Sequence, residues 1–212
     1  MSEKILIISA DEIYPYERQP YSERVTKDLM RLMDSIGRYG IEEPLIVRPR
    51  KAGCYEIISG QRWDYCGRAH NIPDRPVIVR NYTDNEAGIL VADFNISRNE
   101  ILPSELAKAY NLHYDAMKKQ GQRTDLTSGQ FAQKKNSREE LANLLGKTED
   151  ELRRYLSLKD LIPEIMQMVD AQKIKIRPAA EIASLTDNQQ KILFETMNNF
   201  DATPSLAQAI KL

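Results

Sequence analysis

The sequence lacks most of the features that mark membrane, secreted and metal-binding proteins. It has no apolar run long enough to cross a bilayer and no signal-peptide pattern, so we expect a soluble, cytoplasmic protein without a membrane partner. Its 2 cysteines and 2 histidines have no spacing typical of a metal site, and they predict no disulfide framework. The 30 basic and 31 acidic residues nearly balance, so binding to nucleic acid requires a local basic surface.

What the sequence does contain is a change of pattern near its middle. At 212 residues and 42% apolar content, the chain can bury one or two cores. Short apolar runs alternate with helical spacing in the first part, which predicts a mixed α/β domain over residues 1–100. The runs expected to form strands cover residues 4–9, 44–49, 55–58 and 76–80, and helices are expected over 25–40, after Arg62 and over 83–94.

The turn that follows residues 55–58 carries the strongest local chemistry. Ser59 and Gly60 end the predicted strand, and a helix follows. Gly60 permits a tight turn and a close approach to a ligand, and the start of the helix offers unpaired N–H groups to an anion. Arg62 adds a planar, positively charged fork that suits phosphate or carboxylate. An ordinary strand-to-helix connection with Arg62 in solvent has the same pattern, because a single Gly-x-Arg is unspecific.

The rest of the chain is predicted to be all helical. A connecting helix and a basic linker are expected over residues 101–130, and a helical domain over 131–212. Capping-box patterns begin at Ser137 and Thr148, and Gly146 separates the two apolar stripes that follow them. Two short helices joined by a tight turn that contains glycine predict a helix-turn-helix at about 137–160.

Basic residues are concentrated in this helical pair and in the linker before it. The candidate DNA contacts are Lys118, Lys119, Arg123, Lys147, Arg153 and Arg154. Glu149, Asp150 and Glu151 oppose this assignment, since they favour the start of a helix but would face the phosphates of a DNA groove. For the helical pair, we favour DNA contact over the alternative of a packing hairpin. For the linker, composition does not decide between contact with a phosphate backbone and a solvated loop.

Three segments in the first half, found together and in this order, indicate a protein family more specifically than any one of them does. They are 41–48 (Ile-Glu-Glu-Pro-Leu-Ile-Val-Arg), 59–62 (Ser-Gly-Gln-Arg) with Ala69, and 95–98 (Asn-Ile-Ser-Arg). They resemble the three motifs of the ParB family of partition and nucleoid-occlusion proteins, particularly short versions carried by mobile elements of low-GC bacteria. The resemblance covers nearly the whole chain. It implies an α+β, ParB/sulfiredoxin-like domain followed by an all-α helix-turn-helix domain.

The resemblance implies a DNA-bound switch that serves plasmid, chromosome or mobile-element partition or regulation at the nucleoid. In the family, the N-terminal domain binds CTP and Mg²⁺, and the nucleotide closes a homodimer into a clamp around double-stranded DNA. Carried over by position, the nucleotide-binding residues are Gly60, Gln61, Arg62, Asn95 and Arg98. Asn95 would approach the metal, and Arg62 and Arg98 the phosphates. This chemistry is consistent, because Mg²⁺ takes oxygen ligands beside a polyphosphate and arginine neutralises its charge.

Three positions depart from the family motifs. Gln61 stands where glutamate is common, and Trp63 replaces the second arginine. Phe94 precedes Asn95 where the family has an acidic residue, although Asp93 lies one step away. Each lost charge-assisted hydrogen bond is worth about 1.5–3 kcal/mol. We therefore assign no catalytic residue and expect CTP hydrolysis to be slow or absent. No segment that would engage a ParA-type ATPase is recognisable, so that partner is not expected.

Two other classes of function remain open. A protein-binding adaptor could retain the fold after losing both ligands. The α+β domain also resembles sulfiredoxin and is often called nuclease-like, which gives an enzyme alternative. Sulfiredoxin chemistry needs a cysteine in the ligand turn, where this chain has Gln61. A nuclease needs clustered metal-binding carboxylates, and the sequence has no convincing cluster.

Overall fold

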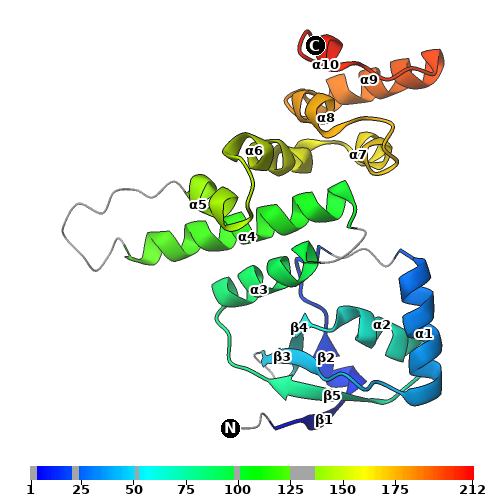
Figure 1. Ribbon diagram of the computed structural model, residues 1–212, viewed down its shortest axis with the longest axis vertical. Coiled ribbons are helices and arrows are strands. Elements are labelled where there is room, and N and C mark those ends of the chain that lie inside the picture. Colours follow the sequence, from blue (N-terminus) through cyan, green and yellow to red (C-terminus); the bar gives the residue numbers. More distant parts are fainter. Residues whose placement is uncertain (1–3, 21–23, 51–52, 98–100, 125–136) are drawn as a thin grey trace. The chain divides into compact units, whose positions relative to one another are not determined.

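A computed structural model of the chain describes residues 4–20, 24–50, 53–97, 101–124 and 137–212 (Figure 1). The chain divides into two compact units, Met1–Phe94 and Asn95–Leu212. The first contains a sheet and helices, and the described part of the second contains helices. The predicted fold class, an α+β domain followed by an all-α domain, is confirmed.

The first unit is built around a five-stranded mixed sheet in the order β1-β5-β3-β4-β2. Its strands are β1 (Leu6–Ser9), β2 (Ile13–Tyr14), β3 (Leu45–Pro49), β4 (Tyr55–Ser59) and β5 (Asp74–Val79). β3 and β4, two of the predicted strands, form an antiparallel hairpin with Val47 opposite Ile57. β5 runs parallel to β3, with Val77 opposite Leu45. These four side chains share one buried cluster, because alternate residues of a strand point to the same face.

Two helices pack on this sheet core. Helices α1 (Lys27–Tyr39) and α2 (Gln61–Ala69) contact each other and lie side by side in Figure 1. Leu29 of α1 and Cys66 of α2 belong to the apolar cluster between them. Trp63 packs against both this cluster and the sheet cluster. The ring of Trp63 therefore joins the helix pair to the sheet.

Helix α3 (Asp84–Ile96) begins with a capping box formed by Thr83 and Glu86. The Glu86 N–H donates to the Thr83 hydroxyl (3.3 Å), and the Glu86 carboxylate accepts from the Thr83 N–H (2.8 Å). The sequence predicted that this helix ends at about Phe94, which was wrong by two residues. Asn95 and Ile96 continue the helix, and Asn95 is only 4% exposed. Neither residue is a strong helix breaker, and Ile96 packs against an apolar cluster of the second unit.

The second unit is organised around one long helix. Its elements are α4 (Pro103–Thr124), α5 (Ser137–Leu144), α6 (Glu149–Ser157), the 3₁₀ helix η2 (Leu158–Asp160), α7 (Pro163–Asp170), α8 (Ile176–Ile182), α9 (Asp187–Phe200) and α10 (Leu206–Ala209). Helix α4 contacts α5, α6, η2 and α7. The rings of Tyr110 and Tyr155 meet edge to face, with centroids 5.5 Å apart, and join α4 to α6.

A long-range cap fixes the start of α4. The Asp170 carboxylate, at the end of α7, accepts hydrogen bonds from the Ser104 N–H (2.9 Å) and hydroxyl (2.6 Å). The Glu105 carboxylate accepts from the Leu102 N–H (3.0 Å). The first N–H groups of a helix have no partner within the helix. Leu102, the residue before α4, has no side-chain acceptor, so the carboxylate of Asp170 caps the helix in its place.

The basic linker expected within residues 101–130 is partly wrong. Helix α4 includes Lys118, Lys119 and Arg123, so these residues lie on a helix rather than in a loop. Lysine, glutamine and arginine favour helices, and Gly121 alone costs only about 1 kcal/mol relative to alanine. The later part of the expected linker lies outside the described residues.

Candidate nucleotide and DNA sites

The turn between β4 and α2 requires glycine at position 60. Gly60 has φ 103° and ψ 15°, a left-handed conformation that other residues rarely adopt. A Cβ atom there would lie 2.8 Å from Leu45 Cγ and 3.2 Å from Leu45 Cα. The Gly60 carbonyl accepts from the Asp64 N–H (3.0 Å) and so begins α2. Glycine has no side chain to cap the helix, so the first-turn N–H groups keep their capacity to bind an anion.

This geometry predicts that Gly60→Ala destabilises the first unit more than Gly40→Ala. Gly40 also has positive φ (77°), but a Cβ there would meet nothing within 4 Å. Backbone strain alone costs about 1–3 kcal/mol at either position, and crowding against buried Leu45 adds about 1–3 kcal/mol at Gly60. Urea unfolding, followed by Trp63 fluorescence, measures both losses. Equal losses would contradict the close approach to Leu45.

Arg62 has an unsatisfied hydrogen-bond donor. Among the described residues, its buried Nε atom has no hydrogen-bond partner. Burial raises the pKa of the Cys66 thiol, and the positive charge of Arg62 offsets part of that rise. An unpaired donor on a charged group is unfavourable unless an acceptor can reach it. A phosphate oxygen has the charge and the lone pairs for this role. The position of Arg62 in the first turn of α2 therefore fits an anion.

The two neighbours of Arg62 have other tasks. The Gln61 side-chain amide donates to the Ile57 carbonyl (3.3 Å), which directs it back to its own strand. Trp63 packs against the apolar clusters of the first unit. Trp63, which stands where the family has its second arginine, thus contributes packing rather than a second positively charged side chain.

Two members of the predicted nucleotide set, Asn95 and Arg98, do not lie in the first unit as the structure describes it. Asn95 is a buried residue of the second unit, and Arg98 lies outside the described residues. The described part of the chain has no group of three or more His, Cys, Asp or Glu residues placed to hold a metal ion. The roles of Asn95 at a metal and of Arg98 at phosphates stay predictions.

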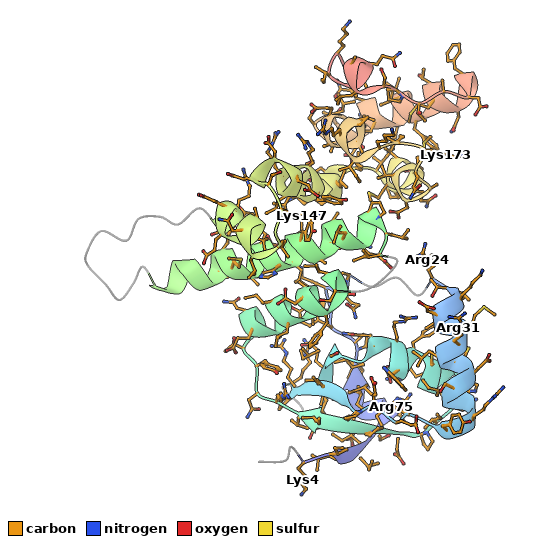
Figure 2. The ribbon with its side chains drawn as sticks, in the orientation of Figure 1. Lys4, Arg24, Arg31, Arg75, Lys147 and Lys173 are labelled. Atoms are coloured by element: carbon orange, nitrogen blue, oxygen red, sulfur yellow. The ribbon has the colours of Figure 1, made fainter. Side chains whose placement is uncertain are left out.

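A buried ionic cluster that sequence reasoning missed anchors α2. Asp64 accepts from Arg75 Nε and from Arg68 Nε, both at 2.8 Å. Arg75, placed inside the first unit in Figure 2, is fully buried. Arg68 Nη2 also donates to the carbonyls of Ala10 (2.9 Å) and Ile13 (2.8 Å). The cluster therefore ties α2, and with it the Gly60 turn, to β5, to Ala10 and to the start of β2.

A second missed cluster ties the β3–β4 hairpin to α3. Arg48 donates to Glu56 (Nε to Oε2, 2.6 Å) and to Asp84 (Nη1 to Oδ1, 2.8 Å). Glu56 is only 1% exposed and also accepts from Arg50 (2.8 Å). Burial, followed by the negative charge of Glu56, raises the pKa of Tyr16, whose ring centroid lies 6.0 Å from Arg48 Cζ. This cluster fixes the first turn of α3.

Helices α5 and α6 have the predicted helix-turn-helix form. The chain turns at Gly146, which has φ 63°, and the Thr148 hydroxyl caps α6 by accepting from the Glu151 N–H (3.1 Å). Leu152 and Leu156 bury one face of α6 against α4 and α5. The opposite face of α6 therefore points outward.

The cations around α6 are largely paired with its own carboxylates. The pairs are Lys147–Glu151 (2.9 Å), Arg153–Asp150 (3.6 Å) and Arg138–Glu149 (3.6 Å). The hydrogen bond to Glu151 is the main cause that raises the pKa of Lys147, which Figure 2 places between α5 and α6. Within the described residues, Arg154 makes no ion pair. Arg154 is thus the candidate that needs no change of partner to contact a phosphate.

The other candidate DNA contacts lie on α4. Lys118 and Lys119 are exposed, and Lys118 Nζ lies 5.4 Å from the Tyr114 ring centroid. The side chain of Arg123 lies outside the described residues. A single strip that joins these residues to α6 stays a prediction. No described helix is both long and apolar enough to cross a membrane.

Comparisons with known proteins show similarity to one family in both parts of the chain. The ParB N-terminal domain model matches residues 1–93, and the ParB HTH domain model matches residues 127–203. The nucleoid occlusion protein of Lysinibacillus sphaericus is 28% identical over 93% of this chain and 61% of its own length. The chromosome-partitioning protein Spo0J of Thermus thermophilus is 30% identical over 76% of this chain and 53% of its own length. The chain thus spans less than two thirds of these relatives.

A solved structure has the same fold. The C-terminally truncated chromosome-partitioning protein ParB of Caulobacter crescentus, complexed to the centromeric parS site, aligns over 96% of both chains with a TM-score of 0.51. Its sequence identity is 18%, so the likeness concerns the fold alone. Because the two ParB domain models match consecutive parts that together make up most of its length, the chain belongs to the ParB family.

Proposed function

We propose that the chain binds double-stranded DNA through α5 and α6, as a homodimer at the nucleoid, in ParB-type partition or regulation. The observation that carries the proposal is the outward face of α6, which presents Arg153 and Arg154 in a domain that matches the ParB HTH model. The complex of C. crescentus ParB with the parS site supports it. In helix-turn-helix proteins the second helix enters the major groove.

The ion pairs of α6 limit how strongly one copy can bind. To contact phosphates, Lys147 and Arg153 must give up their ion pairs with Glu151 and Asp150. The free energy lost with these pairs offsets part of the free energy gained from the phosphate contacts. In a plot of the logarithm of affinity against the logarithm of salt concentration, each phosphate contact contributes about −0.9 to the slope. A few contacts therefore predict modest affinity with a shallow salt dependence. In the proposed homodimer, two copies that bind together double the number of phosphate contacts.

Charge reversal at Arg153 and Arg154 is expected to weaken binding to every duplex. The double variant, Arg153→Glu with Arg154→Glu, should lose at least about tenfold in affinity at low salt. It should also reduce the magnitude of the salt slope by about 1.8, since two phosphate contacts are removed. Fluorescence anisotropy on genomic fragments across a salt series measures both quantities.

The matched control reverses two exposed cations of the first unit, Arg31 and Arg38. It introduces the same charge change, and its affinity should stay within about threefold of wild type if α6 holds the site. Binding that survives reversal at Arg153 and Arg154 would move the DNA site elsewhere. Absence of binding by the wild-type chain at low salt would favour the adaptor function.

We also propose that a cytidine nucleotide binds at the β4–α2 turn together with Mg²⁺. The Gly60 turn offers backbone N–H groups, and the unpaired Arg62 Nε offers a charged donor. Mg²⁺ is commonly held by substrate phosphates with one or two protein oxygens, a role that the resemblance gives to Asn95. Hydrolysis is not part of this proposal, because the Gln61 amide is bonded to its own strand and Trp63 is packed in the core.

A further inference from the structure

The outward face of α6 carries a carboxylate, Asp150, beside its basic residues. Residues three and four positions apart share a helix face, so Asp150 lies beside Arg153 and Arg154. The side chain of Asp150 is 70% exposed, while Leu152 and Leu156 bury the opposite face. If α6 occupies a major groove, as proposed above, Asp150 faces the base edges or the phosphates.

Among the residues that the structure describes, none holds this carboxylate tightly. Its ion pair with Arg153 is 3.6 Å long, and both side chains are largely exposed (61% and 70%). Exposed pairs of this kind are weak, and Arg153 can leave Asp150 for a phosphate or a guanine. The carboxylate is therefore available to a DNA base. Against phosphates alone it would only weaken binding.

An ionised carboxylate accepts hydrogen bonds and cannot donate them, which restricts its partners in the groove. Guanine and thymine present acceptors there, and adenine presents an acceptor beside its amino group. Cytosine presents the N4 amino donor without a neighbouring acceptor of its own. We propose that Asp150 accepts a hydrogen bond from cytosine N4 and makes α6 selective for a cytosine at one position of each half-site. This inference rests on the proposed DNA function of α6.

The test selects duplexes from a random library with the full chain and then measures affinity by fluorescence anisotropy. The wild-type chain should select one position rich in cytosine, and replacing that base pair should weaken binding by about 5- to 150-fold. Asp150→Asn should shift the preference at that position to adenine, because an amide pairs with adenine N6 and N7. The same variant should bind random duplexes more tightly than wild type, since a negative charge is removed.

Asp187→Asn is the matched control. Asp187 is exposed in the first turn of α9, directly after a threonine cap, so the variant has the same charge change and helix-dipole effect. It should leave the base preference unchanged. Selection without a cytosine position, or a preference that Asp150→Asn leaves intact, would overturn the inference while DNA binding stands. No binding to any duplex would overturn both the inference and the proposed function.

Discussion

Asp64→Ala is expected to destabilise the first unit by about 3–5 kcal/mol, the usual loss when one partner of a buried ion pair is removed. Asp64 is 5% exposed, and its two oxygens accept from Arg75 and Arg68 at 2.8 Å. Without the carboxylate, the fully buried guanidinium of Arg75 keeps its charge but loses its counter-ion. The carbonyl contacts of Arg75, such as that with Ile72 (2.6 Å), cannot replace that charge.

Chemical denaturation followed by the fluorescence of Trp63 measures this loss. The chain has 1 tryptophan, and it lies in the cores of the first unit, so the signal reports on that unit. Asp34→Ala removes an exposed carboxylate of α1 and should change stability by less than about 0.5 kcal/mol. A loss below about 1 kcal/mol for Asp64→Ala would mean that the ionic cluster does not anchor α2.

Arg62→Ala is expected to abolish nucleotide binding without unfolding the chain. A hydrogen bond to a charged group is worth about 1.5–3 kcal/mol, so losing a bidentate contact weakens binding at least about a hundredfold. Arg62 Nε has no partner among the described residues, so removing it leaves none of their acceptors without a donor. Isothermal titration with CTP and Mg²⁺ compares the variant with wild type.

The control for this titration is Arg38→Ala, which removes an exposed positive charge from α1 of the same unit. It should bind the nucleotide as wild type does. If wild type gives no heat with any nucleoside triphosphate, the nucleotide proposal fails and a scaffold role takes its place. Equal binding by wild type and Arg62→Ala would place the phosphates away from the β4–α2 turn.

The parts of the fold that the sequence predicted well depend on local signals. The glycine at position 60 takes the positive φ that a tight turn before α2 demands, and Thr148 caps α6 as its spacing predicts. The β3–β4 hairpin follows from two apolar runs separated by a short polar turn. Each of these features depends on residues only a few positions apart, so one sequence suffices to recognise them.

The missed features depend on residues brought together by the fold. Asp64 and Arg75 are 11 positions apart on different elements, and Asp170 caps Ser104 from 66 positions away. No local pattern distinguishes such partners from ordinary surface charges. Similarly, the sequence indicated that Asn95 belongs to a motif but not that its side chain is buried. The turn of the proposed nucleotide site could thus be recognised from the sequence, while the groups that position that turn could not.

Hydrogen–deuterium exchange of the full chain, with and without duplex DNA at low salt, tests the DNA-binding proposal most directly. The backbone amides of the α5–α6 turn and of α6, from Lys147 to Ser157, should exchange more slowly when DNA is present. Helix α9 serves as the internal reference and should exchange at an unchanged rate. Unchanged exchange in α6 under conditions where anisotropy detects binding would contradict the assignment of the DNA site to this helix.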